Sequence, residues 1–240
     1  MAIELAVPPV VDWSEANRTL ATASPQEILR WAVETYHPRL TMATAFGPEG
    51  CIILHMLAEI EPNVRVFNLD TGYQLAETLA LRDRIADRYG IEVEMVGASE
   101  SVVEFEARHG GPLYAVDSDR CCRERKIAPL RPALAGYDAW ISAIRADQSP
   151  DRSRAQVVGW DAKFELAKVN PLLRWTKRDV WAFIVTHKVP YNPLHDQGYP
   201  SIGCWPCTKA VAHGDDERAG RWAGQAKTEC GLHSLDSSQL

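Results

Sequence analysis

The chain has 240 residues, of which 46% are hydrophobic and 24% are charged, close to the average of a soluble globular protein. This composition excludes a collagen-like, low-complexity or wholly disordered chain, and the length suffices for one large domain without disulfides. The formal net charge of −6 argues against a general nucleic-acid or membrane-surface binder, because both need a positive field. The N-terminus lacks the basic segment of a secretory signal, and no apolar run is long enough to span a membrane. We therefore expect a cytoplasmic protein that binds neither nucleic acid nor membrane.

Strand and helix signals alternate along the chain after an N-terminal arm over residues 1–23. Ser24 and Glu27 form a capping box ahead of an amphipathic helix, and Thr176 caps a later helix. Short apolar segments typical of buried strands lie at 40–45, 64–69, 91–96, 139–144 and 166–169, and further helices are predicted at 51–59, from Gly72 to about 89, and near 100–108.

This alternation indicates an α/β fold with a single doubly wound, mainly parallel sheet that helices cover on both faces. We assign the domain to residues 24–213 and a mobile, polar C-terminal tail to residues 214–240. Cys51 lies in an apolar run and is predicted to be a core residue. The indoles of Trp160, Trp175 and Trp181 are likewise predicted to lie in the core rather than against a ligand.

Two loops follow the first two strands and are predicted to bind the ligand, because open parallel sheets bind at the carboxyl ends of their strands. The first loop leads into a helix N-terminus, whose N–H groups and dipole suit an anion; its candidate residues are Thr44, Phe46, Gly47 and Glu49. The second loop contributes Leu69, Asp70, Thr71 and Gly72. The alternatives are an ordinary strand–helix turn for the first loop and, for Asp70, an Asx-turn in place of a contact to ribose or adenine.

The segments T-A-F-G-P-E-G and N-L-D-T-G, each between a strand and a helix, resemble the sulfonucleotide reductase branch of the PP-loop proteins. PP-loop ATP pyrophosphatases carry S-G-G-x-D-S in the first loop. This chain has Phe46 and Gly50 where the extra hydroxyl and acid of that motif would fall. The departure suits a ligand with one phosphate linked to a sulfate.

Four cysteines form two clusters, Cys121-Cys122 and Cys204-x-x-Cys207. Soft thiolates select zinc or an iron–sulfur cluster, and adjacent cysteines are unusual ligands for zinc. Residues 120–131 hold five basic side chains against Glu124 alone, a shell that suits an anionic group, although a solvated basic helix face is the simpler alternative. The motifs C-C-x-x-R-K-x-x-P-L, I-G-C-W-P-C-T and K-T-E-C-G-L-H resemble the iron–sulfur class of adenylyl-sulfate (APS) reductases.

That resemblance covers residues 38 to 233 and implies roles for specific residues. The four cysteines would hold one [4Fe–4S] cluster, Lys126 would position the sulfate, and Cys230 would be the nucleophile. Arg145 and Arg152, in a loop after the fourth strand, resemble the phosphosulfate-binding arginines of the family, since guanidinium binds such oxygens bidentately. Arg218 and Arg221 are candidates to bring positive charge to the sulfate as the tail docks.

The implied reaction is a thioredoxin-dependent reduction of APS to sulfite and AMP through an S-sulfocysteine on Cys230. The same chemistry on the 3′-phosphorylated substrate PAPS, or on both, is one alternative, although relatives specific for PAPS generally lack the four cysteines. A PP-loop sulfur transferase is a second alternative, and a zinc-stabilised binding module in which Cys230 is incidental is a third. A homo-oligomer also stays open.

Overall fold

The computed structural model describes residues 10–212, 214–225, 227, 229 and 232. Its centre is a six-stranded sheet in the order β3-β2-β1-β4-β6-β5. The strands are β1 (Leu40–Thr44), β2 (Arg65–Asp70), β3 (Val93–Gly97), β4 (Ala139–Ile141), β5 (Val158–Asp161) and β6 (Leu166–Val169). All neighbouring pairs are parallel except β5 and β6, which are antiparallel. The predicted α/β fold with a mainly parallel sheet is confirmed, and the antiparallel edge strand β5 was not predicted.

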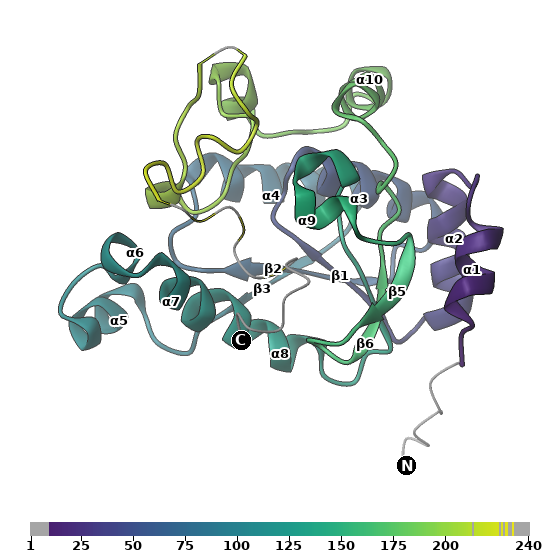
Figure 1. Ribbon diagram of the computed structural model, residues 1–240, viewed down its shortest axis with the longest axis horizontal. Helices are drawn as coiled ribbons and strands as arrows, with labels where there is room; N and C mark the ends of the chain where they lie inside the picture. Colours follow the sequence, from purple (N-terminus) through teal and green to yellow (C-terminus); the bar gives the residue numbers. More distant parts are fainter. Residues whose placement is uncertain (1–9, 213, 226, 228, 230–231, 233–240) are drawn as a thin grey trace.

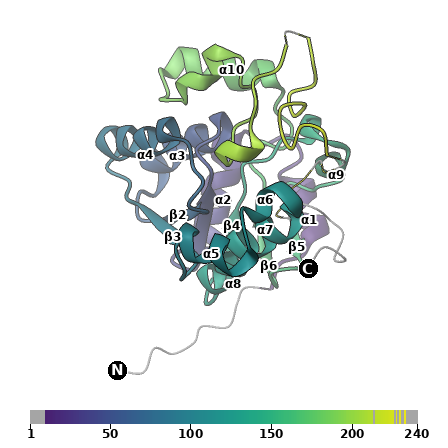
Figure 2. The ribbon, with the colours of Figure 1, turned by 90° about the vertical axis from the view of Figure 1, so that its left-hand side faces the viewer.

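Helices cover both faces of the sheet (Figures 1 and 2). One layer contains α2 (Pro25–Tyr36), α3 (Pro48–Ile60), α4 (Ala76–Tyr89) and α10 (Lys177–His187), and contacts of α3 with α2, α4 and α10 hold it together. The other layer contains α5 (Val102–His109), α6 (Leu113–Val116), α7 (Ser118–Cys122), the π-helix η1 (Arg123–Ile127) and α8 (Ala128–Leu134). Short helices η2 (Ala146–Gln148), α9 (Pro150–Ser153), η3 (Pro193–Gln197) and η4 (Trp205–Cys207) lie in the connections.

Side chains alternate between the two faces, as the period of two along a strand requires. In β4, Ala139 and Ile141 belong to the core cluster under α3, while Trp140 packs with Phe67 and Leu130 on the α8 face. Both faces are therefore apolar, which explains why the strands read as short, nearly continuous apolar runs in the sequence. Cys51 is fully buried in the first cluster, as predicted.

The segment predicted as an N-terminal arm contains a helix, α1 (Trp13–Thr19). Its Asn17 side chain donates to the carbonyl of Val158 and accepts from the Val158 N–H, at 2.7 and 3.2 Å. Ala16 and Leu20 belong to the main core. The helix escaped prediction because seven residues are too few to show a helical period.

The prediction that Trp160 lies in the core was wrong, since this residue is 56% exposed on edge strand β5. Trp175 packs against the core, as predicted. Trp181 also packs there but in addition lines a cavity described below. Trp160 lies on the same face of β5 as the buried Val158, so the layer that covers this face ends between the two residues. The sequence carries no signal for that boundary.

The connections explain where the fold can bind a ligand. The chain passes from β1 through α3 to β2 and through α4 to β3, then returns through the second helical layer to β4 on the other side of β1. The strand order thus reverses between β1 and β4, and loops that leave these strands on opposite faces open a crevice at their carboxyl ends. None of the described helices is long and apolar enough to span a membrane.

Candidate active site

A cavity of about 450 Å³ lies at the carboxyl ends of β1, β2 and β4, where the strand order reverses. The loop after β1 forms one side, and residues of α10 and of the segment 200–204 form another. Glu217, Arg218, Arg221, Trp222 and Leu232 from the C-terminal part of the chain also line it. Of the predicted site residues, the cavity brings together Thr44, Gly47, Glu49, Leu69, Thr71, Lys126, Arg145, Arg152, Cys204, Arg218 and Arg221.

The loop after β1 has the geometry of an anion site. Helix α3 begins with Gly47 as N-cap and no side-chain cap bond, and Gly47 to Gly50 line the cavity, so the first turn of the helix lies on the cavity wall. A Cβ at Gly50 would lie 2.7 Å from the Thr44 hydroxyl oxygen, which explains the glycine there. Phe46, with a φ of 55°, is buried in the core and does not line the cavity.

The loop after β2 is an Asx-turn, the simpler of the two alternatives for Asp70. The Asp70 carboxylate accepts from the Gly72 N–H at 2.8 Å, and neither residue lines the cavity. Leu69 and Thr71 do line it, and the Thr71 hydroxyl lies 3.1 Å from the sulfur of Cys204. The loop therefore joins the predicted nucleotide site to the predicted cysteine site.

Arg145 is buried and surrounded by carboxylates. Its guanidinium contacts Glu49, Asp147 at 2.8 Å and Glu217 at 3.2 Å. Burial raises the pKa of the Glu49 carboxyl, and the adjacent Arg145 guanidinium opposes that shift. Glu49 comes from the first turn of α3 and Glu217 from the C-terminal part, so Arg145 ties three segments together at the cavity.

Arg152 and Arg218 share a second carboxylate, that of Glu229. Arg152 donates to both oxygens of Glu229, at 2.9 and 3.1 Å, and Arg218 donates to one of them at 3.2 Å. Glu229 is 6% exposed. The sequence prediction missed both Glu217 and Glu229, although Glu229 directly precedes Cys230 in the motif that carries the proposed nucleophile.

The four predicted ligand cysteines lie near one another. Burial raises the pKa of the Cys121 thiol to about 12, and the thiols of Cys122, Cys204 and Cys207 add to that shift. Burial likewise raises the pKa of Cys207 to about 11, with contributions from Cys204 and Cys122, while Arg221 and Lys227 oppose it. Among the described residues, no three His, Cys, Asp or Glu side chains are grouped as a single metal ion would need.

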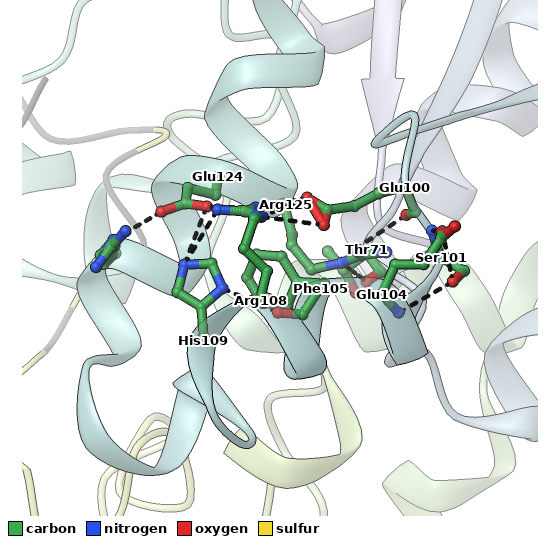
Figure 3. Close-up of polar contacts among 10 residues, drawn as sticks. Thr71, Glu100, Ser101, Glu104, Phe105, Arg108, His109, Glu124 and Arg125 are labelled. Atoms are coloured by element: carbon green, nitrogen blue, oxygen red, sulfur yellow. Dashed lines mark hydrogen bonds and ion pairs between the residues drawn. The ribbon is translucent and has the colours of Figure 1, made fainter.

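A buried arginine joins these cysteines to the loop after β2. Figure 3 shows Arg125 of η1 reaching Thr71, whose carbonyl accepts from the Arg125 Nε at 2.6 Å, and the Glu100 carbonyl accepts from Nη1 at 3.3 Å. The guanidinium also lies over the Phe105 ring, 4.9 Å from its centre. The same π-helix carries Lys126, which lines the cavity. One short element therefore places Arg125 against the loop after β2 and Lys126 on the cavity wall.

Arg221 supports the other pair of cysteines. It donates to the carbonyls of Cys207 and Ile202, at 3.2 and 3.3 Å, and a Cβ at Gly203 would lie 2.3 Å from its guanidinium. Residues Thr208 and Arg221 also form a β-bridge. The described part of the predicted tail is thus packed on the domain. Cys230, the predicted nucleophile, lies outside the described residues.

Comparison with known proteins assigns the chain to a family. Residues 39–210 match the model of the phosphoadenosine phosphosulfate reductase domain. The chain belongs to the phosphoadenosine phosphosulfate reductase family. It is 49% identical to the phosphoadenosine 5′-phosphosulfate reductase of Gloeobacter violaceus, with 88% of this chain and 89% of that one aligned. It is 46% identical to adenosine 5′-phosphosulfate reductase 2 of Bacillus subtilis, over 86% and 88% of the two chains.

The solved structures agree with this assignment. The phosphoadenylyl-sulfate reductase of Candida auris, solved as a phosphate complex, superposes with a TM-score of 0.74 at 32% identity, covering 85% of this chain and all of that one. An FMN adenylyltransferase from Candida glabrata shares the fold alone, with a TM-score of 0.58 at 15% identity and 94% and 79% of the two chains covered. The family that the sequence motifs predicted is confirmed, and the chain is a reductase of that family.

Within this family fold, the cavity also has lining residues that the motifs did not indicate. Lys177, Val180 and Trp181 of α10 and His195 of η3 line it. The Trp181 and His195 rings meet edge to face, with centres 5.6 Å apart. The spacing of the α10 residues in the sequence is that of an ordinary core helix, so only the positions of α10 and η3 beside the cavity identify these four residues.

Proposed function

We propose that this reductase converts adenosine 5′-phosphosulfate to sulfite and AMP in the cytoplasm, with electrons from reduced thioredoxin or a similar dithiol. The observation that carries the proposal is one cavity that unites the α3 N-terminus, Lys126, Arg218 and Cys204. The helix N-terminus and the cations suit the phosphosulfate anion. The shared lining supports the assignment of the nucleotide, the sulfate and the cysteine cluster to adjoining sites.

The binding roles follow from the side chains. The N–H groups of Gly47, Glu49 and Gly50 would hold the phosphate. Leu69 and Thr71 would contact the nucleoside. Lys126 would bind the sulfate, since its helix also supports the cysteines, and Arg218 and Arg221 would add positive charge from the C-terminal part. Arg145 lines the cavity, but its Nε, Nη1 and Nη2 already donate to three carboxylates, so it would shape the anion site by holding Glu49 and Glu217 in place. Phe46, Asp70 and Gly72 shape the two loops without lining the cavity.

We assign a [4Fe–4S] cluster to Cys121, Cys122, Cys204 and Cys207. The donor set fits, because the thiols of Cys122, Cys204 and Cys207 lie close enough to raise the pKa of the Cys121 thiol. The basic side chains of Arg125, Arg221 and Lys227 lie around this group. In such a cluster each cysteine binds a different iron, so the sulfurs need not converge on one point as four zinc ligands must. When bound, the cluster supplies a local electrostatic field and fixes the segments that carry Lys126 and Arg221, while the electrons come from thiols.

The chemistry consists of two displacements at sulfur. In the first, the Cys230 thiolate attacks the sulfate sulfur, an S–S bond forms, the S–O bond to the phosphate breaks, and AMP leaves with that electron pair. In the second, a thioredoxin thiolate attacks the Cys230 sulfur and expels sulfite. The second thioredoxin thiol then closes the thioredoxin disulfide and returns Cys230 as a thiolate. The dithiol supplies both electrons.

Turnover with each substrate tests the proposal. We expect anaerobically purified protein with reduced thioredoxin to release sulfite and AMP from APS with a kcat/KM at least about 10-fold above that for PAPS, a difference of roughly 1.4 kcal/mol. A preference for PAPS would reassign the substrate to the one named for the Gloeobacter violaceus relative.

Metal analysis of the same preparation separates the two other candidates. About four irons and four sulfides per chain support the cluster, whereas zinc without sulfide supports a metal-stabilised binding module. A PP-loop sulfur transferase would consume ATP and would release no sulfite from APS.

A further inference from the structure

The Glu229 carboxylate occupies two of the arginines that the sequence assigns to the substrate. It accepts from Arg152 through both oxygens, from Arg218 at 3.2 Å, and from the Ser149 hydroxyl at 3.1 Å. The Glu229 side chain is 4% exposed and that of Arg152 is 10% exposed. Breaking a buried ion pair of this kind is costly, because removal of one partner leaves the charge of the other buried and uncompensated.

Arg152 has little capacity left for a substrate anion. Its Nε and Nη2 donate to Glu229, and its Nη1 donates to the Gln148 side chain at 2.5 Å. A bidentate grip on phosphate or sulfate would use the same edge of the guanidinium that Glu229 now occupies. Arg145 is engaged to the same extent, because its Nε, Nη1 and Nη2 each donate to a carboxylate. None of those three carboxylates adjoins the proposed nucleophile in the sequence, so only the pair of Arg152 with Glu229 bears on that segment.

We infer that Glu229 is a positioning residue that docks the segment bearing Cys230, and that Arg152 acts through Glu229 rather than on the substrate. The inference rests on the proposed function, because it assigns Cys230 as the nucleophile. Glu229 is bonded to Cys230 through one peptide link, so fixing its carboxylate restricts where the thiol can lie. Arg218 binds the same carboxylate and also lines the cavity, so it would serve both the docked segment and the sulfate.

Two neighbouring contacts support a docked segment but are weaker anchors. The Lys227 ammonium donates to the Ser118 carbonyl at 2.9 Å and pairs with Asp119, which is 62% exposed. Leu232 packs against the apolar cluster around Phe67 and Trp140. Neither contact buries an ion pair, so the Glu229 pair is the one whose loss should displace the thiol most.

A double-mutant cycle on the first chemical step tests the assignment. We expect Glu229→Gln and Arg152→Gln each to slow S-sulfocysteine formation from saturating APS by roughly 30-fold or more, as for other truncated buried charge pairs. The double variant should be about as slow as either single variant, because both changes remove the same contact. Effects that multiply in the double variant would overturn the inference, since they would mean that Arg152 acts independently of Glu229.

Substrate affinity gives a second, independent readout. In the Cys230→Ser background, where no sulfur transfer occurs, we expect Arg152→Gln to change the Kd of APS by less than about 3-fold, and Glu229→Gln to leave it equal or tighter. Weakening of APS binding by about 10-fold or more on Arg152→Gln alone would place Arg152 on the substrate and would also contradict the inference.

Controls separate a positioning role from general damage. Glu94→Gln removes a carboxylate that pairs with Arg65 on an exposed edge of the sheet. This variant should leave the rate of S-sulfocysteine formation and the rate of adduct reduction unchanged. Glu229→Asp, which keeps the charge but shortens the reach, should recover part of the lost rate. Reduction of a preformed adduct by thioredoxin should be unchanged or faster in Glu229→Gln, which misfolding would not produce. If the unmodified protein forms no adduct, the proposed function itself fails, whatever the variants do.

Discussion

At the scale of single residues, the sequence identified which side chains reach the cavity better than it identified their partners. Arg145, Arg152 and Arg218 all line the site as predicted, because each belongs to a loop or segment at the strand ends. Their carboxylate partners, Glu49, Glu217 and Glu229, come from distant parts of the chain. No local pattern encodes such pairings, since they depend on how the loops fold over one another.

Gly72 shows how one residue links the nucleotide loop to the cysteines. Its φ is +75°, and a Cβ would lie 2.4 Å from a Val102 methyl and 3.0 Å from the Arg125 guanidinium. We expect Gly72→Ala to destabilise the fold by about 2–4 kcal/mol, from positive φ and overpacking together. Anaerobic urea unfolding measures this change. Gly90→Ala is the matched control, because Gly90 has a φ of +65° and a Cβ there would meet no atom within 4 Å. An equal loss of unfolding free energy in both variants would contradict the contribution from overpacking at Gly72.

At the scale of elements, long apolar or capped segments were predictable and short ones were not. The capping boxes of α2 and α10 form as the sequence indicates, with Glu27 and Asp179 reaching back to Ser24 and Thr176. The π-helix η1 carries Arg125 inward while Lys126 lines the cavity. Nothing in its composition distinguishes it from an ordinary helix, because the extra residue per turn depends on packing against the loop after β2.

The packing of α10 on α3 predicts a pH dependence of stability. His55 of α3 lies against Tyr89, Phe183 and His187, and its Nδ1 is buried without a partner among the described residues. Burial lowers the pKa of His55 below its ordinary 6.5, with help from His187 and Arg88 and against Glu59. Stability from the neutral imidazole is therefore present above pH 6.5 and is lost as the pH falls through the lower folded-state value.

We expect His55→Phe to lose less stability than the unmodified protein when the pH falls from 7.5 to 5.5, because the new ring fills the same aromatic cluster without binding a proton. Urea unfolding at both pH values measures the difference. Equal losses in the two proteins would show that His55 does not contribute to the acid sensitivity.

At the scale of the whole molecule, the strand order explains why the site lies where it does. Reversal between β1 and β4 opens the crevice, the second helical layer brings Lys126 to its wall, and the segment 200–204 brings Cys204. From the alternation of strands and helices, the sequence predicted a mainly parallel sheet with the ligand site at its strand ends, but not the strand order. Arg221 lines the cavity, where we expected the tail to dock. The contacts that hold this part of the chain, from Arg221 to the Cys207 carbonyl and from Glu229 to Arg152, could not be predicted, because they join residues far apart in the chain.

The central claim is that Cys230 takes the sulfonate group from APS before any reductant acts. Intact mass of anaerobically purified protein, mixed separately with APS and with PAPS in the absence of thiols, tests it most directly. We predict a gain of one SO₃ group with APS, absent in Cys230→Ser and removed by reduced thioredoxin. No added mass with either substrate, or an adduct that persists in Cys230→Ser, would contradict the account.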